Sequence, residues 1–234
     1  MSTAAVLSDF FTAALREARS ERPASLASRI PALDELTEGG FPVNALTELF
    51  IPHAGIGEVR MLLPALASLK HVTWVLPCDS EAAPYAPALA DAGLDLDRQL
   101  FSIPSTPEEA FWCAEQAAAS GETSAVVWLN PLVHGKDGAA LARLDMAAHS
   151  TGTTIFLIRP SSMACTPSPA ELRLMLRPGR SGTVHVRATR RGAFFDRTRE
   201  ADVSLEERPL VPAPRACRRK VQKALASARL SPAC

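Results

Sequence analysis

The residues with the clearest chemical potential lie in a loop that follows the first long apolar run, residues 45–51. A glycine-bearing loop between an apolar strand and a helix is the arrangement in which backbone N–H groups cradle phosphates. When the loop is aligned on Gly57, the pattern G-x-x-x-x-G-K-[ST] requires glycine at 52, lysine at 58 and serine or threonine at 59. The chain has Pro52, Glu58 and Val59 at these positions.

Each of these three residues removes one part of nucleotide chemistry. Pro52 has no N–H to donate, and Val59 has no hydroxyl for Mg²⁺. Glu58 places negative charge where the lysine would meet the β and γ phosphates, and two like charges ~4 Å apart repel by about 4 kcal/mol at an effective dielectric near 20. We therefore expect a degenerate phosphate loop that binds no cofactor, in which Gly55 and Gly57 only make a tight turn.

Other catalytic and metal-binding patterns are missing from the sequence. The apolar run 125–129 continues to Asn130, where an aspartate would be needed to hold Mg²⁺. The five histidines form no i, i+4 pair with a carboxylate partner, and no G-x-S-x-G motif occurs. The five cysteines include no CxxC pair, which is typical of a protein of the reducing cytoplasm. The sequence therefore predicts no metal site, no catalytic residue and no enzyme.

The elements that must position this loop follow from the apolar pattern. Short apolar runs are typical of strands buried on both faces, and helical patterns between them require a parallel sheet. The expected strands are residues 47–51, 72–76, 99–103, 125–129 and 153–158, and the expected helices are residues 59–69, 85–92, 107–120 and 138–150. We predict a doubly wound α/β domain with Trp74, Trp112 and Trp128 in its core.

The pattern changes after Pro160. Leucines at 172, 174 and 176 alternate with arginines, and a second alternating run covers residues 184–189. With Pro178 and Gly179 between them, the two runs predict a β-hairpin whose apolar face points inward and whose arginine-rich face points outward. The expected organisation is an amphipathic N-terminal helix at 4–19 with a polar linker (1–27), an α/β domain (28–202) and a basic, proline-containing tail (203–234).

The net charge of zero hides two oppositely charged segments. Residues 1–158 carry 9 Lys and Arg and 19 Asp and Glu, whereas residues 159–234 carry 16 basic and 6 acidic side chains. A basic end of this kind suits a protein groove or DNA phosphates, and a solvated surface is the alternative. The candidate partner-binding residues are Arg187, Arg190 and Arg191 near the hairpin and Arg215, Arg218, Arg219, Lys220 and Lys223 in the tail.

Several segments together resemble a known family. They are IPALDELTEGGFPVNALTEL with the loop after it, the block Pro84-Tyr85-Ala86-x-x-Leu89 with Ala92-Gly93-Leu94-Asp95, and TTIFLIRP. These segments resemble the RecA-like core found in the ImuA family, the accessory proteins of bacterial inducible mutagenesis cassettes. The resemblance covers roughly residues 28–200 and implies a RecA-like parallel sheet flanked by helices.

The resemblance also implies a function. ImuA proteins have a non-enzymatic role in the SOS response to DNA damage, where they join RecA to the ImuB polymerase-like subunit, a Y-family relative, and indirectly to a DnaE-type polymerase in translesion synthesis. Asp79 and Glu81 follow the second expected strand, close to the position at which RecA-like ATPases place their water-activating glutamate. Without a phosphate loop a general base has no substrate, so we interpret them as a helix N-terminal cap region.

The alternative is a SulA-like inhibitor of cell division that binds FtsZ. The SulA family is similar to residues 57–160 of this chain. The ImuA family is preferred because the segment before Gly57 holds a first strand and loop, and because an arginine-rich hairpin and tail follow Pro160. For either family we expect a cytoplasmic protein without a membrane segment.

Overall fold

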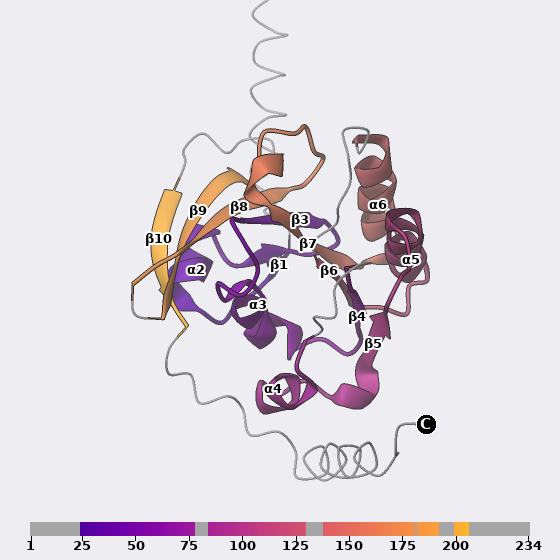
Figure 1. Cartoon of the computed structure of the whole chain (residues 1–234), viewed down its shortest axis with the longest axis horizontal. Helices are drawn as coiled ribbons and strands as arrows, with labels where there is room; N and C mark the ends of the chain where they lie inside the picture. The colour runs from indigo at the N-terminus through magenta and orange to yellow at the C-terminus, as the bar shows by residue number, and fades with distance from the viewer. Residues whose placement is uncertain (1–23, 78–83, 130–137, 181, 192–198, 206–234) are drawn as a thin grey trace, which may run out of the picture.

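The computed structural model of the chain describes residues 24–77, 84–129, 138–180, 182–191 and 199–205, and its centre is an eight-stranded sheet (Figure 1). The strand order is β10-β9-β8-β3-β7-β6-β4-β5. From β8 through β5 every neighbouring pair is parallel, and β9 and β10 continue the sheet as antiparallel strands. The predicted α/β class with a mostly parallel sheet is therefore confirmed. The strands are β3 (Leu46–Ile51), β4 (Val72–Val75), β5 (Gln99–Ser102), β6 (Ala125–Leu129), β7 (Thr154–Pro160), β8 (Leu172–Pro178), β9 (Thr183–Arg191) and β10 (Arg199–Ser204).

Helices cover both faces of the parallel part of this sheet. Side chains of α2 (Pro31–Leu36), α3 (Glu58–Leu66) and α4 (Ala86–Asp91) enter one apolar core, which includes Leu49 and Phe156. Side chains of α5 (Pro107–Ala119) and α6 (Gly138–Thr151) enter the second core, which includes Leu46 and Leu157. Because successive side chains of a strand point to opposite faces, one apolar run supplies both cores.

Short elements complete the fold. A two-stranded sheet pairs β1 (Ser25–Leu26) with β2 (Phe41–Pro42). The 3₁₀ helix η1 (Leu96–Arg98) precedes β5, and η2 (Ser161–Met163) follows β7. Since β1 lies within the residues expected to form a polar linker, the folded part begins a few residues earlier than the predicted boundary at 28.

The C-terminal boundary also differs from the prediction. The strand β10 crosses residue 203, where the tail was expected to start, and Val203 is fully buried. The strand pattern was missed because β10 is an edge strand on which small apolar side chains alternate with Glu200 and Asp202. The N-terminal helix predicted at 4–19 and the tail from residue 206 lie outside the described residues.

The tryptophans do not all belong to the core. Trp74 and Trp128 are buried, as predicted, and Trp74 donates its indole N–H to the side chain of Gln99 at 3.0 Å. The prediction for Trp112 was wrong, because its side chain is 61% exposed. Helix α5 buries Ala110, Ala114 and Ala118 at helical spacing, so residue 112 falls away from the buried stripe.

Candidate functional site

A cleft of about 990 Å³ lies at the carboxyl ends of the central parallel strands. Ile51 and Leu129, the last residues of β3 and β6, line it, together with Ile158 and Pro160 at the end of β7. This edge of an open α/β sheet is where ligands bind in such folds. The loop after β3, which was singled out from the sequence, forms one wall of the cleft, and α4 contributes another.

In the loop, the carboxylate of Glu58 is turned back onto the backbone. Its Oε1 accepts a hydrogen bond from the Gly55 N–H at 3.0 Å, and its Oε2 accepts one from the Gly57 N–H at 3.0 Å. Glu58 is the first residue of α3 and is only 6% exposed. Backbone N–H groups at a helix N-terminus form an anion-binding concavity. The chain's own carboxylate therefore fills the position that a phosphate would take.

The sequence predicted only that Glu58 repels a phosphate, whereas the structure shows its carboxylate bound to the loop N–H groups. The predicted residues Pro52, Gly55, Gly57, Glu58 and Val59 do come together at the cleft. The sequence reasoning nevertheless missed the inward turn of the Glu58 side chain. A signal for it was present, because an acidic residue directly after a glycine at a helix start is well placed to accept loop N–H groups.

The backbone conformation favours glycine at position 57, and a side chain there would also displace Leu205. The φ of Gly57, +106°, is one that side-chain-bearing residues rarely adopt, and a Cβ atom there would lie 2.3 Å from Cδ1 of Leu205. Gly55 also has a positive φ of +87°, yet a Cβ atom there would meet nothing within 4 Å. The residue after β10 therefore packs directly against the loop of the cleft.

The part of the lining that comes from Tyr85 and α4 is apolar and carries an exposed aromatic ring. Tyr85 precedes α4 and is 68% exposed, and Ala88 and Leu89 follow it along the lining. Among the lining residues, the ionisable groups of the loop side are His53, Glu58 and Arg60. Most of the surface offered to a ligand is therefore hydrocarbon.

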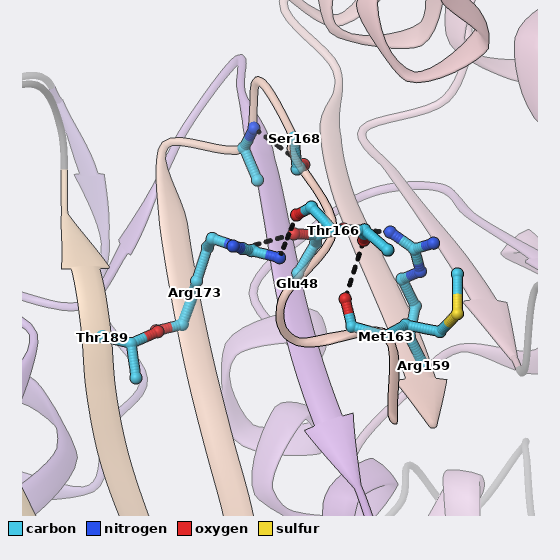
Figure 2. A network of polar contacts seen from close by, with 8 residues as sticks. Glu48, Arg159, Met163, Thr166, Ser168, Arg173 and Thr189 are labelled. Carbon is cyan, nitrogen blue, oxygen red and sulfur yellow. Dashed lines mark hydrogen bonds and ion pairs between the residues drawn. The ribbon is translucent and has the colours of Figure 1, made fainter. Parts of the chain in front are cut away.

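A second polar site lies on one face of the central sheet (Figure 2). Glu48 on β3 is fully buried, and its Oε1 accepts a hydrogen bond from Nη1 of Arg159 at 2.5 Å. Its Oε2 accepts one from Nε of Arg173 at 2.7 Å. Glu48 alternates with Leu49, which points to the other face, so this network and the α3 core lie on opposite sides of β3.

Arg173 of this network also contacts the segment that follows η2. Nη2 of Arg173 donates to the carbonyl oxygen of Thr166 at 3.1 Å, and the guanidinium lies 4.8 Å from the ring centroid of Phe50. The network thus ties β3, β7, β8 and the segment after η2 together. These contacts explain why charged side chains can be buried here, and they assign Glu48 a structural role.

The predicted partner-binding arginines are only partly described. Arg187 on β9 is exposed and forms an ion pair with Glu200 of β10 at 3.1 Å. His185 on the same strand faces Asp202 at 2.9 Å and Glu200 at 3.5 Å. The charge of Arg187 is therefore offset by β10, and this arginine does not line the cleft. The other candidate side chains, those of Arg190, Arg191, Arg215, Arg218, Arg219, Lys220 and Lys223, lie outside the described part, as do Asp79, Glu81 and Asn130.

The described residues also bear on metal binding and on membrane insertion. No group of three or more His, Cys, Asp and Glu side chains there is arranged to hold a metal ion. None of the helices in the described ranges combines the length and the apolarity needed to cross a bilayer.

Comparison with known proteins does not identify a family. No protein-family model matches the chain, and a search of curated proteins finds no match either.

Proposed function

We propose that the chain is a RecA-like adaptor protein without ATPase activity that acts in damage-induced translesion DNA synthesis in the cytoplasm. In this proposal the α/β domain binds RecA, and the basic C-terminal part binds an ImuB-like Y-family subunit, which connects it indirectly to a DnaE-type polymerase. DNA phosphates are the alternative target of the basic part. The antiparallel pairing of β8 with β9 supports the arginine-rich hairpin that this proposal includes.

The observation that carries the proposal is the position of Glu58. A RecA-like ATPase needs free backbone N–H groups and a lysine at this loop. Here the carboxylate of Glu58 accepts hydrogen bonds from the N–H groups of Gly55 and Gly57. A nucleotide would have to displace this carboxylate and then remain beside its negative charge. The chain keeps the loop between β3 and α3 but lacks the groups that bind a nucleotide. This combination supports a role in binding other proteins.

The partners are proposed from the resemblance to the ImuA family, and a pull-down tests them. The deletion should remove residues 206–234 and not 203–234, because loss of Val203 would expose part of the core. The full chain is expected to capture RecA and the ImuB-like subunit, and the shortened chain is expected to capture RecA alone. If the shortened chain captures both partners equally well, the tail has no part in binding. If neither chain captures RecA, the proposal is wrong.

A matched pair of variants separates a specific basic surface from net charge. Arg218→Glu with Arg219→Glu changes the tail, and Lys70→Glu with Arg98→Glu makes the same charge change at two exposed positions of the α/β domain. Only the first pair should weaken capture of the ImuB-like subunit. Co-sedimentation with FtsZ polymers, with inhibition of their assembly, would favour the SulA-like alternative.

A further inference from the structure

We propose that the cleft is a docking site for residues 209–214 of the same chain, Pro-Leu-Val-Pro-Ala-Pro. The cleft offers hydrocarbon from the ends of three strands, and the exposed ring of Tyr85 is also part of its lining. Apolar hollows of this size on a protein surface mark sites that bind something. The occupant follows from the course of the chain, from its chemistry and from the charge of the loop.

The chain leaves the described fold beside the cleft. The N–H of Leu205 donates to the carbonyl oxygen of Gly182 at 3.2 Å, which fixes the end of β10. The side chain of Leu205 lies against Gly57, which itself lines the cleft. Residues 209–214 follow Leu205 by four to nine positions. An extended chain covers at most ~3.5 Å per residue, or about 14 to 32 Å over that stretch, which is enough to enter and cross the cleft.

The segment has the chemistry that the cleft requires. Leu210 and Val211 are apolar, and the prolines at 209, 212 and 214 have no N–H that would be left without a partner in an apolar site. Proline also restricts the backbone before docking, so less conformational entropy is lost when the segment binds. Proline-rich segments dock in grooves that present aromatic rings, as Tyr85 does here.

The loop between β3 and α3 disfavours a phosphorylated ligand, which is the alternative occupant of the cleft. Glu58 is seated on the glycine N–H groups and presents negative charge at that end of the cleft. The segment 209–214 carries no charge. A tethered segment also has an effective concentration on the order of 1 mM. If the separate peptide binds with a dissociation constant of about 0.1 mM, the docked form of the chain would be about ten times as populated as the open form.

Thiol labelling of the full chain tests the proposal. Ala88 lines the cleft and is exposed in the described structure, so Ala88→Cys places a reporter there without disturbing the core. The labelling rate of Cys at 88 is read from its own peptide by mass spectrometry. The native Cys165, which is exposed and absent from the cleft lining, is the internal reference.

The decisive comparison adds Leu210→Asp and Val211→Asp to the reporter chain. We expect this change to raise the labelling rate at position 88 by about tenfold and to leave Cys165 unchanged. Leu230→Asp with Ala224→Asp adds the same charge elsewhere in the tail and should leave both rates unchanged. Equal rates at position 88 with and without the change at 210 and 211 would overturn the proposal.

Two further readouts distinguish other occupants and other causes. Protection that increases with protein concentration would mean that the tail of a second copy fills the cleft, which contradicts docking within one chain. Hydrogen exchange of residues 84–92 in the chain without the cysteine reporter should accelerate when Leu210 and Val211 are replaced. If exchange in this segment is unaffected, the segment 209–214 does not contact α4.

Discussion

Two buried carboxylates of this chain lie ten positions apart and are held in different ways. Glu48, in the middle of β3, is bound by the guanidinium groups of Arg159 and Arg173. Glu58, at the start of α3, is bound by the backbone N–H groups of Gly55 and Gly57. The first site is enclosed by the sheet and its covering segment, and the second opens on the cleft.

The difference separates a structural charge from a carboxylate in a ligand position. The partners of Glu48 are side chains from two other strands, so its interactions exist only when β3, β7 and β8 are assembled. The partners of Glu58 are local amide groups that would bind any small anion. Replacing Glu48 should therefore damage the fold, whereas replacing Glu58 should reopen a binding site.

The largest expected effect is the loss of stability in Glu48→Gln. Removal of one partner from a buried ion pair costs about 3–5 kcal/mol, because the charge of Arg159 stays buried after its carboxylate is neutralised. Glu58→Gln should cost only about 1 kcal/mol, since water in the open cleft can replace a lost hydrogen bond. Urea denaturation measures both values, and Glu122→Gln, at an exposed position, is the control. Equal losses at 48 and 58 would remove the distinction between the two sites.

The next effect concerns the two glycines that hold Glu58. Gly57→Ala should lower the free energy of unfolding by about 1–3 kcal/mol, because it combines a strained φ with a clash against Leu205. Gly55→Ala has a similar conformational cost and no clash, so it should cost less. Thermal unfolding of the two variants compares them directly. A larger loss in Gly55→Ala would contradict the packing of Leu205 on the loop.

Strands in the middle of the sheet could be predicted from the sequence more closely than the edge strand β10. Strands buried on both faces are continuous apolar runs, so β3, β4, β6 and β7 were located within a residue or two. The edge strand β10 has one solvated face and a mixed composition, so its residues were assigned to other segments. The prediction for Trp112 rested on its position inside an expected helix, whereas the alanine stripe of α5 determines which face is buried.

The sites of Glu58 and Glu48 also differ in how much of each could be predicted from the sequence. The loop could be found because its glycines and the missing lysine follow a local pattern. Whether Glu58 points into the cleft or onto the loop depends on the positive φ of Gly57, which the residue types alone do not determine. The network of Glu48 could not be found from the sequence, since its partners lie 111 and 125 positions away.

A smaller effect is expected when the anion position is emptied. Glu58→Ala should allow inorganic phosphate to bind at the freed N–H groups, and about 20 mM phosphate acting on a site with a dissociation constant of about 5 mM adds about 1 kcal/mol of stability. The native chain should gain nothing comparable. Glu122→Ala makes the same charge change at an exposed position and serves as the control in the same thermal unfolding series. If phosphate stabilises all three chains alike, the loop is not the binding site.

Calorimetric titration of the native chain with Mg·ATP tests the central claim most directly. With the loop N–H groups bound to Glu58 and no lysine or hydroxyl at positions 58 and 59, no binding heat is expected at concentrations up to about 1 mM, where typical nucleotide enzymes are saturated. Binding with a micromolar dissociation constant would mean that Glu58 leaves the loop readily, and it would contradict a protein without ATPase function.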